Sequence, residues 1–355
     1  MSDGDAVVYC SGAFSTTYGK TAHGLVRFTR RYRVRAVIDP ECAGKDAGEL
    51  LDGTRCGIPI VATLDEALAV ARRAGGKLRY FVVGLATDGG RVSSELRLAA
   101  RRAIEAGLSV DNGLHEFFSD DPQLVRLADQ HAVTLRDVRK TAPRHQLHAF
   151  SGRIERVEAL RVAVLGTDSA IGKRTTAWIL LHALHAAGYH AELIGTGQTA
   201  WMQGARFGII LDSLINDFVA GELEHAVVSA WDEKKPQVMV IEGQGSLMNP
   251  AYPGGFEIVA ATRPQAVILQ HAPARLEYDG FPGYPIQPLD HQIRAIELVS
   301  GRPVVAVTVN HEGLDSLQTD QACRRISDQT GLSACDPIRH GAAALVSVLC
   351  GMVPQ

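Results

Sequence analysis

The stretch Arg161–Thr176 reads RVAVLGTDSAIGKRTT, and it decides the fold of the second half of this 355-residue chain. An apolar run is followed by Gly166, five further residues, Gly172 and Lys173, and then by a segment rich in Leu, Ala and His. This order predicts a buried strand, a glycine-rich loop and the N-terminus of a helix. Backbone N–H groups of such a loop converge on one point, where Lys173 adds a positive charge, so the stretch predicts a phosphate site. The candidate phosphate- or cofactor-binding residues are Gly166, Thr167, Asp168, Ser169, Ala170, Ile171, Gly172, Lys173, Arg174, Thr175 and Thr176.

The loop departs from the usual phosphate loop, GxxxxGK[ST], in two ways. It has one extra residue between its glycines, and in this it resembles the GTDTxxGKT loop of dethiobiotin synthetase. Arg174 also stands where ATPases place the Ser or Thr that ligates magnesium. Either Thr175 takes the magnesium through a shifted turn, or Lys173 and Arg174 hold an uncleaved phosphate without a metal. The second alternative suits coenzyme A, and no metal ligands are assigned.

Strand-like runs alternate with helical patterns along the whole chain, and this alternation predicts α/β structure with mostly parallel sheets. The pattern occurs twice, on either side of a polar segment at residues 141–158. We therefore expect a Rossmann-like N-terminal domain over residues 1–145 and a P-loop NTPase-like domain over residues 146–355. The predicted strands are Ala6–Tyr9, Val34–Ile38, Pro59–Val61, Tyr80–Val83, Leu108–Val110, Arg161–Leu165, His190–Ile194, Gln237–Ile241, Ala266–Leu269 and Val304–Val309, and the clearest helical patterns are Leu64–Arg73 and Ser94–Ala106.

Several polar residues follow predicted strands of the second domain, where parallel strands present their carboxyl ends. Glu242 in VMVIEGQGS is the first candidate for an acid, base or metal residue, and His271 is the second candidate base. Possible substrate contacts are Gln198, Arg206, Arg263, Arg275 and Tyr278, and we expect about one of the three arginines to bind a carboxylate. Tyr278 lies in an eighteen-residue segment, 272–289, whose length and lack of period predict a functional loop or lid.

The N-terminal loop CSGAFSTTYGKTAHG is a candidate second ligand site, because it follows a predicted strand and precedes a predicted helix. Its glycine-rich turn holds Gly12, Gly19, Lys20 and Thr21, and Asp39 ends the next strand, where a dinucleotide-binding fold places an acid for ribose. The loop lacks the GxGxxG fingerprint. A turn that binds no ligand is the equal alternative.

Composition limits the classes of function. Lys plus Arg number 36 and Asp plus Glu 39, for a net charge of −3, so neither a nucleic-acid footprint nor a membrane surface has electrostatic support. The six cysteines form no CxxC pair and indicate reduced thiols. We expect a cytoplasmic enzyme with a small-molecule amino-acid substrate, and a homo-oligomer on base rates.

Longer segments resemble a known family. LGTDSAIGKRTT, IGTGQTAWMQGARFGIILDSLINDFVAGELE, VMVIEGQGSLMNPAYPG and AVVYCSGAFSTTYGKTAHGLVRF are similar to a bacterial two-domain family, formerly of unknown function, that includes D-glutamate N-acetyltransferases. The resemblance covers nearly the whole chain and implies acetyl transfer from acetyl-CoA to the amine of an amino acid, D-glutamate above all. It leaves the acceptor and the choice of base between Glu242 and His271 open. The alternative functions are an ATP- and Mg-dependent ligase or kinase of the dethiobiotin synthetase type, and a nucleotide-binding protein without turnover.

Overall fold

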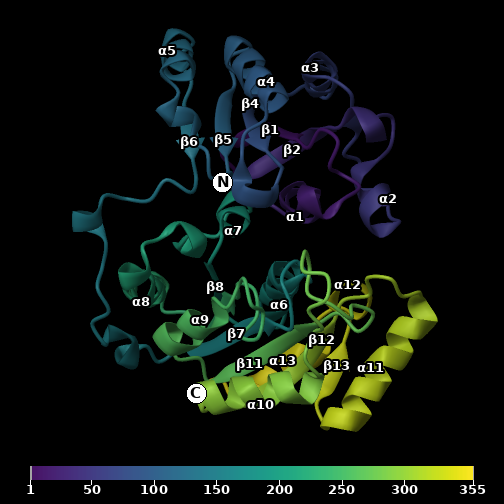
Figure 1. The fold of residues 1–355 in the computed structure, drawn as a ribbon, viewed down its shortest axis with the longest axis vertical. Helices are drawn as coiled ribbons and strands as arrows, with labels where there is room; N and C mark the ends of the chain where they lie inside the picture. The colour runs from purple at the N-terminus through teal and green to yellow at the C-terminus, as the bar shows by residue number, and fades with distance from the viewer. Residues whose placement is uncertain (1, 355) are drawn as a thin grey trace. The chain divides into compact units, whose positions relative to one another are not determined.

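The computed structural model describes residues 2–354 and divides into two compact α/β units (Figure 1). The first unit comprises the chain up to Thr141 together with Gln198–Gly204, and the second comprises Ala142–Gly197 and the chain from Ala205 onward. The range 146–355 expected for the second domain therefore contains a seven-residue segment that packs with the first unit. No helix within residues 2–354 is long and apolar enough to cross a membrane.

The first unit is built on a six-stranded sheet in the order β3-β2-β1-β4-β5-β6, with every pair of neighbours parallel. This is the strand order of dinucleotide-binding Rossmann folds, which confirms the predicted fold of this half. The strands are β1 (Gly4–Tyr9), β2 (Tyr32–Ile38), β3 (Ile60–Val61), β4 (Leu78–Val83), β5 (Ser109–Asn112) and β6 (Leu135–Asp137).

Helices cover both faces of this sheet. One face carries α1 (Lys20–Arg27), α2 (Ala47–Asp52) and α7 (Gln198–Met202), and the other carries α3 (Leu64–Arg73), α4 (Ser94–Glu105) and α5 (Pro122–Gln130). Helix α4 illustrates the local cause: Leu96, Ala100 and Ile104 recur every four residues on its buried face. The Ser93 side chain accepts a hydrogen bond from the Leu96 backbone N–H and so caps the start of this helix.

Helix α7 belongs to the first unit by its contacts, although it follows a strand of the second sheet. Met202 is fully buried in the core that also holds Leu25 and Val82. The Gln203 side-chain amide donates to the carbonyl of Gly24 at 2.8 Å, and the Arg31 guanidinium lies 3.8 Å from the ring centroid of Trp201. No local sequence pattern predicts that the chain leaves the second sheet here to pack in the first unit.

The second unit is built on a seven-stranded parallel sheet in the order β13-β12-β11-β7-β10-β8-β9. Strand β7, which precedes the glycine-rich loop, lies between β10 and β11 near the middle of the sheet. The strands are β7 (Leu160–Gly166), β8 (Ala191–Gly195), β9 (Phe207–Gly208), β10 (Val238–Glu242), β11 (Ala266–His271), β12 (Val304–Val309) and β13 (Ser333–Cys335).

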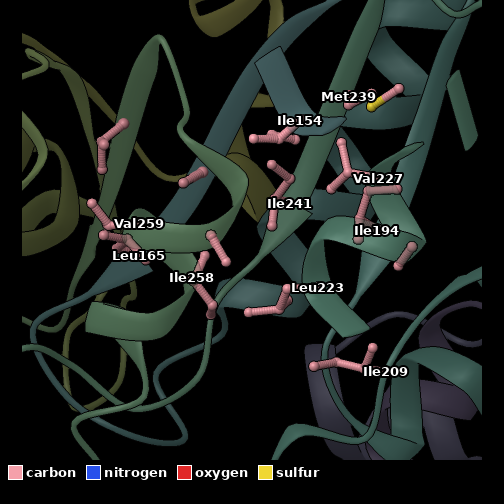
Figure 2. Close-up of a cluster of buried hydrophobic side chains, with 14 of the residues drawn as sticks. Ile154, Leu165, Ile194, Ile209, Leu223, Val227, Met239, Ile241, Ile258 and Val259 are labelled. Carbon is pink, nitrogen blue, oxygen red and sulfur yellow. The ribbon is translucent and has the colours of Figure 1, made fainter. Parts of the chain in front are cut away.

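One face of this sheet is covered by α8 (Asn216–Lys234), α9 (Gly255–Thr262), α10 (Leu289–Ser300) and α11 (Ser316–Thr330). Figure 2 shows the core beneath α8 and α9, where Ile194 and Ile241 of the strands meet Val227 of α8. The other face carries α6 (Lys173–Ala186), which packs with α12 (Pro337–His340) and α13 (Ala343–Cys350). Short 3-10 turns connect the elements: Thr17–Gly19, Pro40–Cys42, Asp88–Gly90, Phe118–Asp120, Arg144–Gln146, Arg153–Arg156 and Leu211–Ser213.

The structure yields a test of the role of α7. Because Met202 is fully buried among residues of the first unit, Met202→Ala should lower the free energy of unfolding by about 2–5 kcal/mol. Hydrogen exchange should also quicken first in β1 and β4. The matched control is Leu345→Ala on α13, an equally buried side chain of the second unit, which should quicken exchange in β12 and β13 instead. The same exchange pattern in both variants would contradict the assignment of α7 to the first unit.

Candidate functional site

The glycine-rich loop follows β7 at the carboxyl edge of the second sheet, and α6 begins at Lys173. Gly172 has φ +94°, a left-handed backbone that residues with a side chain rarely adopt. A Cβ at Gly166 would lie 2.8 Å from Cδ of Lys173, so only glycine leaves room for the lysine there. The two glycines thus shape the loop around the lysine side chain.

Lys173 turns back over the loop from the first position of α6. Its side chain is buried, and Nζ donates to the carbonyl oxygen of Asp168 at 2.5 Å. The same Nζ lies 3.0 Å from the position of a Cβ at Gly166. An ammonium held inside such a loop at a helix N-terminus is the arrangement that binds phosphate oxygens in P-loop proteins.

The carboxylate of Asp168 ties the loop to two other segments, although the residue is completely buried. One of its oxygens accepts from the Ser169 backbone N–H at 2.7 Å and from Nδ2 of Asn249 at 2.9 Å. The other accepts from Nη1 of Arg275 at 2.8 Å and from the Asp279 backbone N–H at 2.9 Å. Four donors satisfy a buried charge here, as burial of a carboxylate requires.

Arg275 is the only one of the three predicted arginines that the structure brings to this loop. Its Nη1 also donates to the Ser169 carbonyl at 2.9 Å, and Nη2 donates to Glu312 at 2.5 Å. Burial lowers the pKa of Arg275, but its bonds to Asp168 and Glu312 raise the pKa by more, so the net shift is upward. The guanidinium therefore stays charged and fastens segment 272–289 to the phosphate loop.

The positions of the other two arginines correct the expectation of a common edge. Arg263 ends α9 before β11, contacts Glu155 at 2.7 Å and accepts at its carbonyl from Arg161 near the start of β7. Because β7 and β11 are parallel, Arg263 lies at the amino edge, opposite to the loop. Arg206 directly precedes β9, the edge strand that β10 and β8 separate from β7, and it pairs with exposed Glu233 on α8. The edge predicted for Arg263 is wrong, and Arg206 is engaged in a surface ion pair with Glu233.

Glu242 ends β10 beside the loop and is only 4% exposed. Its carboxylate accepts from the Thr196 backbone N–H at 3.3 Å. Burial raises the pKa of Glu242, and the nearby charges of Arg174 and Lys173 offset part of that rise. Both cations of the loop therefore act electrostatically on this carboxyl group.

The two threonines after Arg174 differ in their surroundings. The Thr176 hydroxyl donates to Oε1 of Gln270 on β11 at 2.5 Å, and Thr308 donates to the same oxygen. Thr176 is thereby committed to packing α6 against the sheet, whereas Thr175 has intermediate burial. Among the residues that the structure describes, no group of three or more His, Cys, Asp or Glu could hold a metal ion.

His271 ends β11 at the same edge, and its Nδ1 lies 3.0 Å from Oγ1 of Thr167 in the loop. Burial, and then the charge of Arg325, lower the pKa of His271 to about 4. The imidazole is consequently neutral near pH 7 and is a weak base there.

Of the two remaining predicted contacts, Tyr278 lies in the segment fastened to the loop and Gln198 lies in the first unit. Tyr278 is buried within segment 272–289, where its backbone N–H donates to Tyr284. Gln198 begins α7 in the first unit and packs against Gly113 there.

Two asparagines that the sequence analysis did not predict also bind the loop. Asn249 donates to Asp168, and Nδ2 of Asn310 donates to the Ile171 carbonyl at 2.8 Å. No local pattern distinguishes either residue from other asparagines.

Asp39, which follows the next strand, holds the backbone of the N-terminal loop in place. The Asp39 carboxylate accepts from the backbone N–H groups of Gly12, Phe14 and Glu41 at 2.9–3.1 Å. A Cβ at Gly19 would lie 2.6 Å from the Ala13 carbonyl oxygen, and Lys20 is exposed. The Thr21 hydroxyl lies 3.0 Å from that of Thr199 on α7. Asp39 therefore anchors the turn, instead of lying open to a ribose as the fingerprint places it.

Comparisons with known proteins place both halves in one family. The family described as "Domain of unknown function (DUF1611_C) P-loop domain" matches residues 148–346, and its partner, "(DUF1611_N) Rossmann-like domain", matches residues 40–141. A crystal structure of a DUF1611 family protein from Anabaena variabilis is 30% identical, with a TM-score of 0.89 over 98% of this chain and 100% of the other.

Two relatives carry the name D-glutamate N-acetyltransferase. The one from Tritonibacter scottomollicae is 32% identical over 301 residues, which is 83% of this chain and 87% of the relative. The one from a Pseudoalteromonas species is 29% identical over 284 residues, which is 77% of this chain and 81% of the relative.

Replacing Asp168 tests the network around its carboxylate. Asp168→Asn turns one acceptor oxygen into an amide nitrogen that faces two existing donors, and it removes the negative charge that pairs with Arg275. We expect a loss of about 3–5 kcal/mol in the free energy of unfolding, measured by urea titration. Asp290→Asn is the matched control, because Asp290 pairs with Arg294 on the exposed surface of α10 and should change stability by less than about 0.5 kcal/mol. Equal small losses in the two variants would argue against a structural role for Asp168.

The lowered pKa of His271 predicts how the stability of the native state depends on pH. Because its pKa falls from 6.5 to about 4 on folding, the unfolded chain takes up a proton first as the pH drops. The native state should therefore lose stability between pH 6.5 and 4, by up to about 1.4 kcal/mol per pH unit. The raised pKa of Glu242 has the opposite effect on stability as the pH falls, but this effect is the same in wild type and in a His271→Gln variant. The free energy of unfolding of the wild type minus that of His271→Gln, measured by urea unfolding, should be smaller at pH 5 than at pH 7. A constant difference would contradict the lowered pKa.

Proposed function

This chain belongs to the DUF1611 family, and we propose that it is an N-acetyltransferase that moves the acetyl group of acetyl-CoA to the amine of D-glutamate. The names of the two relatives support an N-acetyltransferase. The donor, the acceptor and the residue roles given below are our proposals for this chain.

The observation that carries the proposal is the pair of adjacent cations, Lys173 and Arg174, at the start of α6. A magnesium-dependent P-loop enzyme has a hydroxyl directly after the lysine to ligate the metal. Here Arg174 occupies that position, and its positive charge lowers the pKa of nearby Glu242. Two fixed positive charges beside converging backbone N–H groups suit the diphosphate of coenzyme A, which is bound and released without cleavage.

The reaction requires a nucleophilic amine and an acyl donor that is activated before it binds. The thioester supplies the activated acetyl group. The substrate nitrogen forms a bond to the carbonyl carbon, the C–S bond breaks, and the thiolate of coenzyme A leaves. The ammonium must lose a proton before attack and the amide nitrogen loses a second one, so a base is needed close to the acceptor.

Glu242 is the better of the two candidate bases. Burial raises the pKa of Glu242 from its ordinary acidic value toward the operating pH, as suits a general base. The His271 imidazole, with its pKa near 4, is a weaker acceptor and is hydrogen-bonded to Thr167 in the loop. We therefore propose Glu242 as the base and His271 as a residue that positions Thr167.

Recognition of the acceptor needs a cation for its carboxylates, and Arg275 is the arginine of the predicted set that lies at this edge. Its contact with Asp168 is buried, whereas the partner at its other nitrogen, Glu312, is 53% exposed. We propose that a substrate carboxylate displaces Glu312 from Arg275 and leaves the bond to Asp168 in place, since the exposed ion pair is the weaker of the two.

The proposal is tested by ligand-dependent melting with acetyl-CoA, coenzyme A, ATP with magnesium, and NAD. At 100 times its Kd a ligand stabilises by about 2.7 kcal/mol, so the two CoA compounds should each raise the Tm by several degrees. Stabilisation by ATP with magnesium alone would instead favour a ligase or kinase in which Thr175 and Glu242 hold the metal.

Two variants connect the binding to the cation pair. Lys173→Ala and Arg174→Ala should each weaken CoA at least about 10-fold in calorimetry, since each removes a charge-assisted contact to phosphate. Arg294→Ala, which removes an exposed arginine from α10, should leave the affinity unchanged. An Arg174→Ser variant that gained magnesium-dependent ATP hydrolysis and kept full CoA affinity would overturn the role given to Arg174.

A further inference from the structure

Three aromatic side chains gather in the second unit on the two loops that meet at Asp168. Tyr252 follows β10, and Phe281 and Tyr284 belong to segment 272–289. The ring centroids of Tyr252 and Phe281 are 6.3 Å apart, and those of Phe281 and Tyr284 are 6.4 Å apart, in edge-to-face arrangements. We call these three residues the aromatic cluster.

The aromatic cluster is fastened to the phosphate loop through Asp168. Asn249 donates to Asp168, and its side-chain oxygen accepts from the Tyr252 backbone N–H at 3.0 Å. On the other loop the Asp279 backbone N–H donates to Asp168, two residues before Phe281. Because three residues of chain span at most about 10 Å, the backbones of Tyr252 and Phe281 lie close to the loop.

The segment that carries Phe281 and Tyr284 is internally bonded. The Phe281 backbone N–H donates to the carbonyl of Tyr278 at 2.9 Å, and the Tyr284 N–H donates to the carbonyl of Phe281 at 3.1 Å. Glu277 and Pro285 form an isolated antiparallel bridge. The aromatic residues are thus displayed from an ordered backbone.

The cluster remains open in the described chain. Tyr252 is 54% exposed and Tyr284 is 56% exposed, although aromatic side chains gain most from burial. Large apolar side chains that gather in the open beside a polar site mark a surface for a ligand or partner. Phosphate binding and substrate carboxylate recognition use the cations of the loop and leave the cluster without a role.

We infer that the aromatic cluster binds the pantetheine arm of the coenzyme whose phosphates Lys173 and Arg174 hold. This inference rests on the proposed function. The arm is a chain of methylene, dimethyl and amide groups, and aromatic faces with hydroxyl tips can pack against the first two and hydrogen-bond the third. The cluster joins the phosphate loop through Asp168, so one extended molecule can occupy both.

The test separates the arm from the phosphates by using two ligands. Coenzyme A contains both parts, whereas adenosine 3′-phosphate 5′-diphosphate keeps the base and phosphates and lacks the arm. Calorimetry on the full chain should show that Tyr252→Ala and Tyr284→Ala each weaken coenzyme A about 5- to 10-fold. The shorter ligand should bind these variants within about 2-fold of wild type. Lys173→Ala should weaken both ligands.

The controls exclude a general effect of losing an exposed aromatic side chain. Phe150→Ala removes a ring that is 47% exposed in the second unit and should leave both affinities unchanged. Tyr284→Ser provides a second variant at an exposed position if Tyr252→Ala fails to fold, and the Tm of each protein reports its folding.

The outcomes distinguish this inference from the proposed function. If the wild-type protein binds neither coenzyme A nor acetyl-CoA, both the proposed function and this inference are wrong. Wild-type affinity for coenzyme A in the tyrosine variants defeats the inference alone, as does an equal loss for the two ligands, which would mean that the rings only position the loop. A tyrosine variant that changes the oligomeric state while its CoA affinity stays constant would assign the cluster to a protein contact instead.

Discussion

The buried carboxylate of Asp168 is the constraint on which the candidate site depends. A carboxylate with no access to water is costly unless donors surround it, and the cost of losing one partner is several kcal/mol. The four donors to Asp168 come from Ser169 in its own loop, Asn249 after β10, and Arg275 and Asp279 after β11. Three loops that are far apart in the sequence therefore have to take up one mutual arrangement. The positions of Arg275 and of the aromatic cluster follow from this requirement.

Groups of opposite charge lie close together at the loop. Lys173 and Arg174 bring two positive charges to the start of α6, and the nearest strand end contributes Glu242. Burial alone disfavours the charged form of that carboxyl, while the cations favour it. A phosphate entering the loop would neutralise part of the charge of Lys173 and Arg174 and would therefore raise the pKa of Glu242. Anion binding and the basicity of Glu242 are thus linked through Lys173 and Arg174.

The chain passes from the second unit to the first directly after the residues that contact Glu242. Thr196 follows β8 and donates its backbone N–H to Glu242, and two residues later Gln198 begins the helix that completes the first unit. The segment returns at Ala205 to form β9 in the second sheet. Thr196, which donates to Glu242, and Met202, which is buried in the core of the first unit, therefore lie close together in the sequence.

Local sequence pattern is enough to predict most of the strands and helices and the phosphate loop. Alternating strands and helices predict both parallel sheets, α3 and β12 have the predicted bounds, and Gly166, Gly172 and Lys173 mark the loop, because hydrophobic period and glycine backbone preference act over a few residues. Strands β6, β9 and β13, of two or three residues, were too short to show a period. The contact of Arg275 with Asp168, the position of Arg263 at the other edge and the packing of α7 in the first unit depend on how the elements are arranged in three dimensions. Three of the four partners of Asp168 are 81 to 111 positions away, so strand direction and packing, which local pattern does not contain, select them.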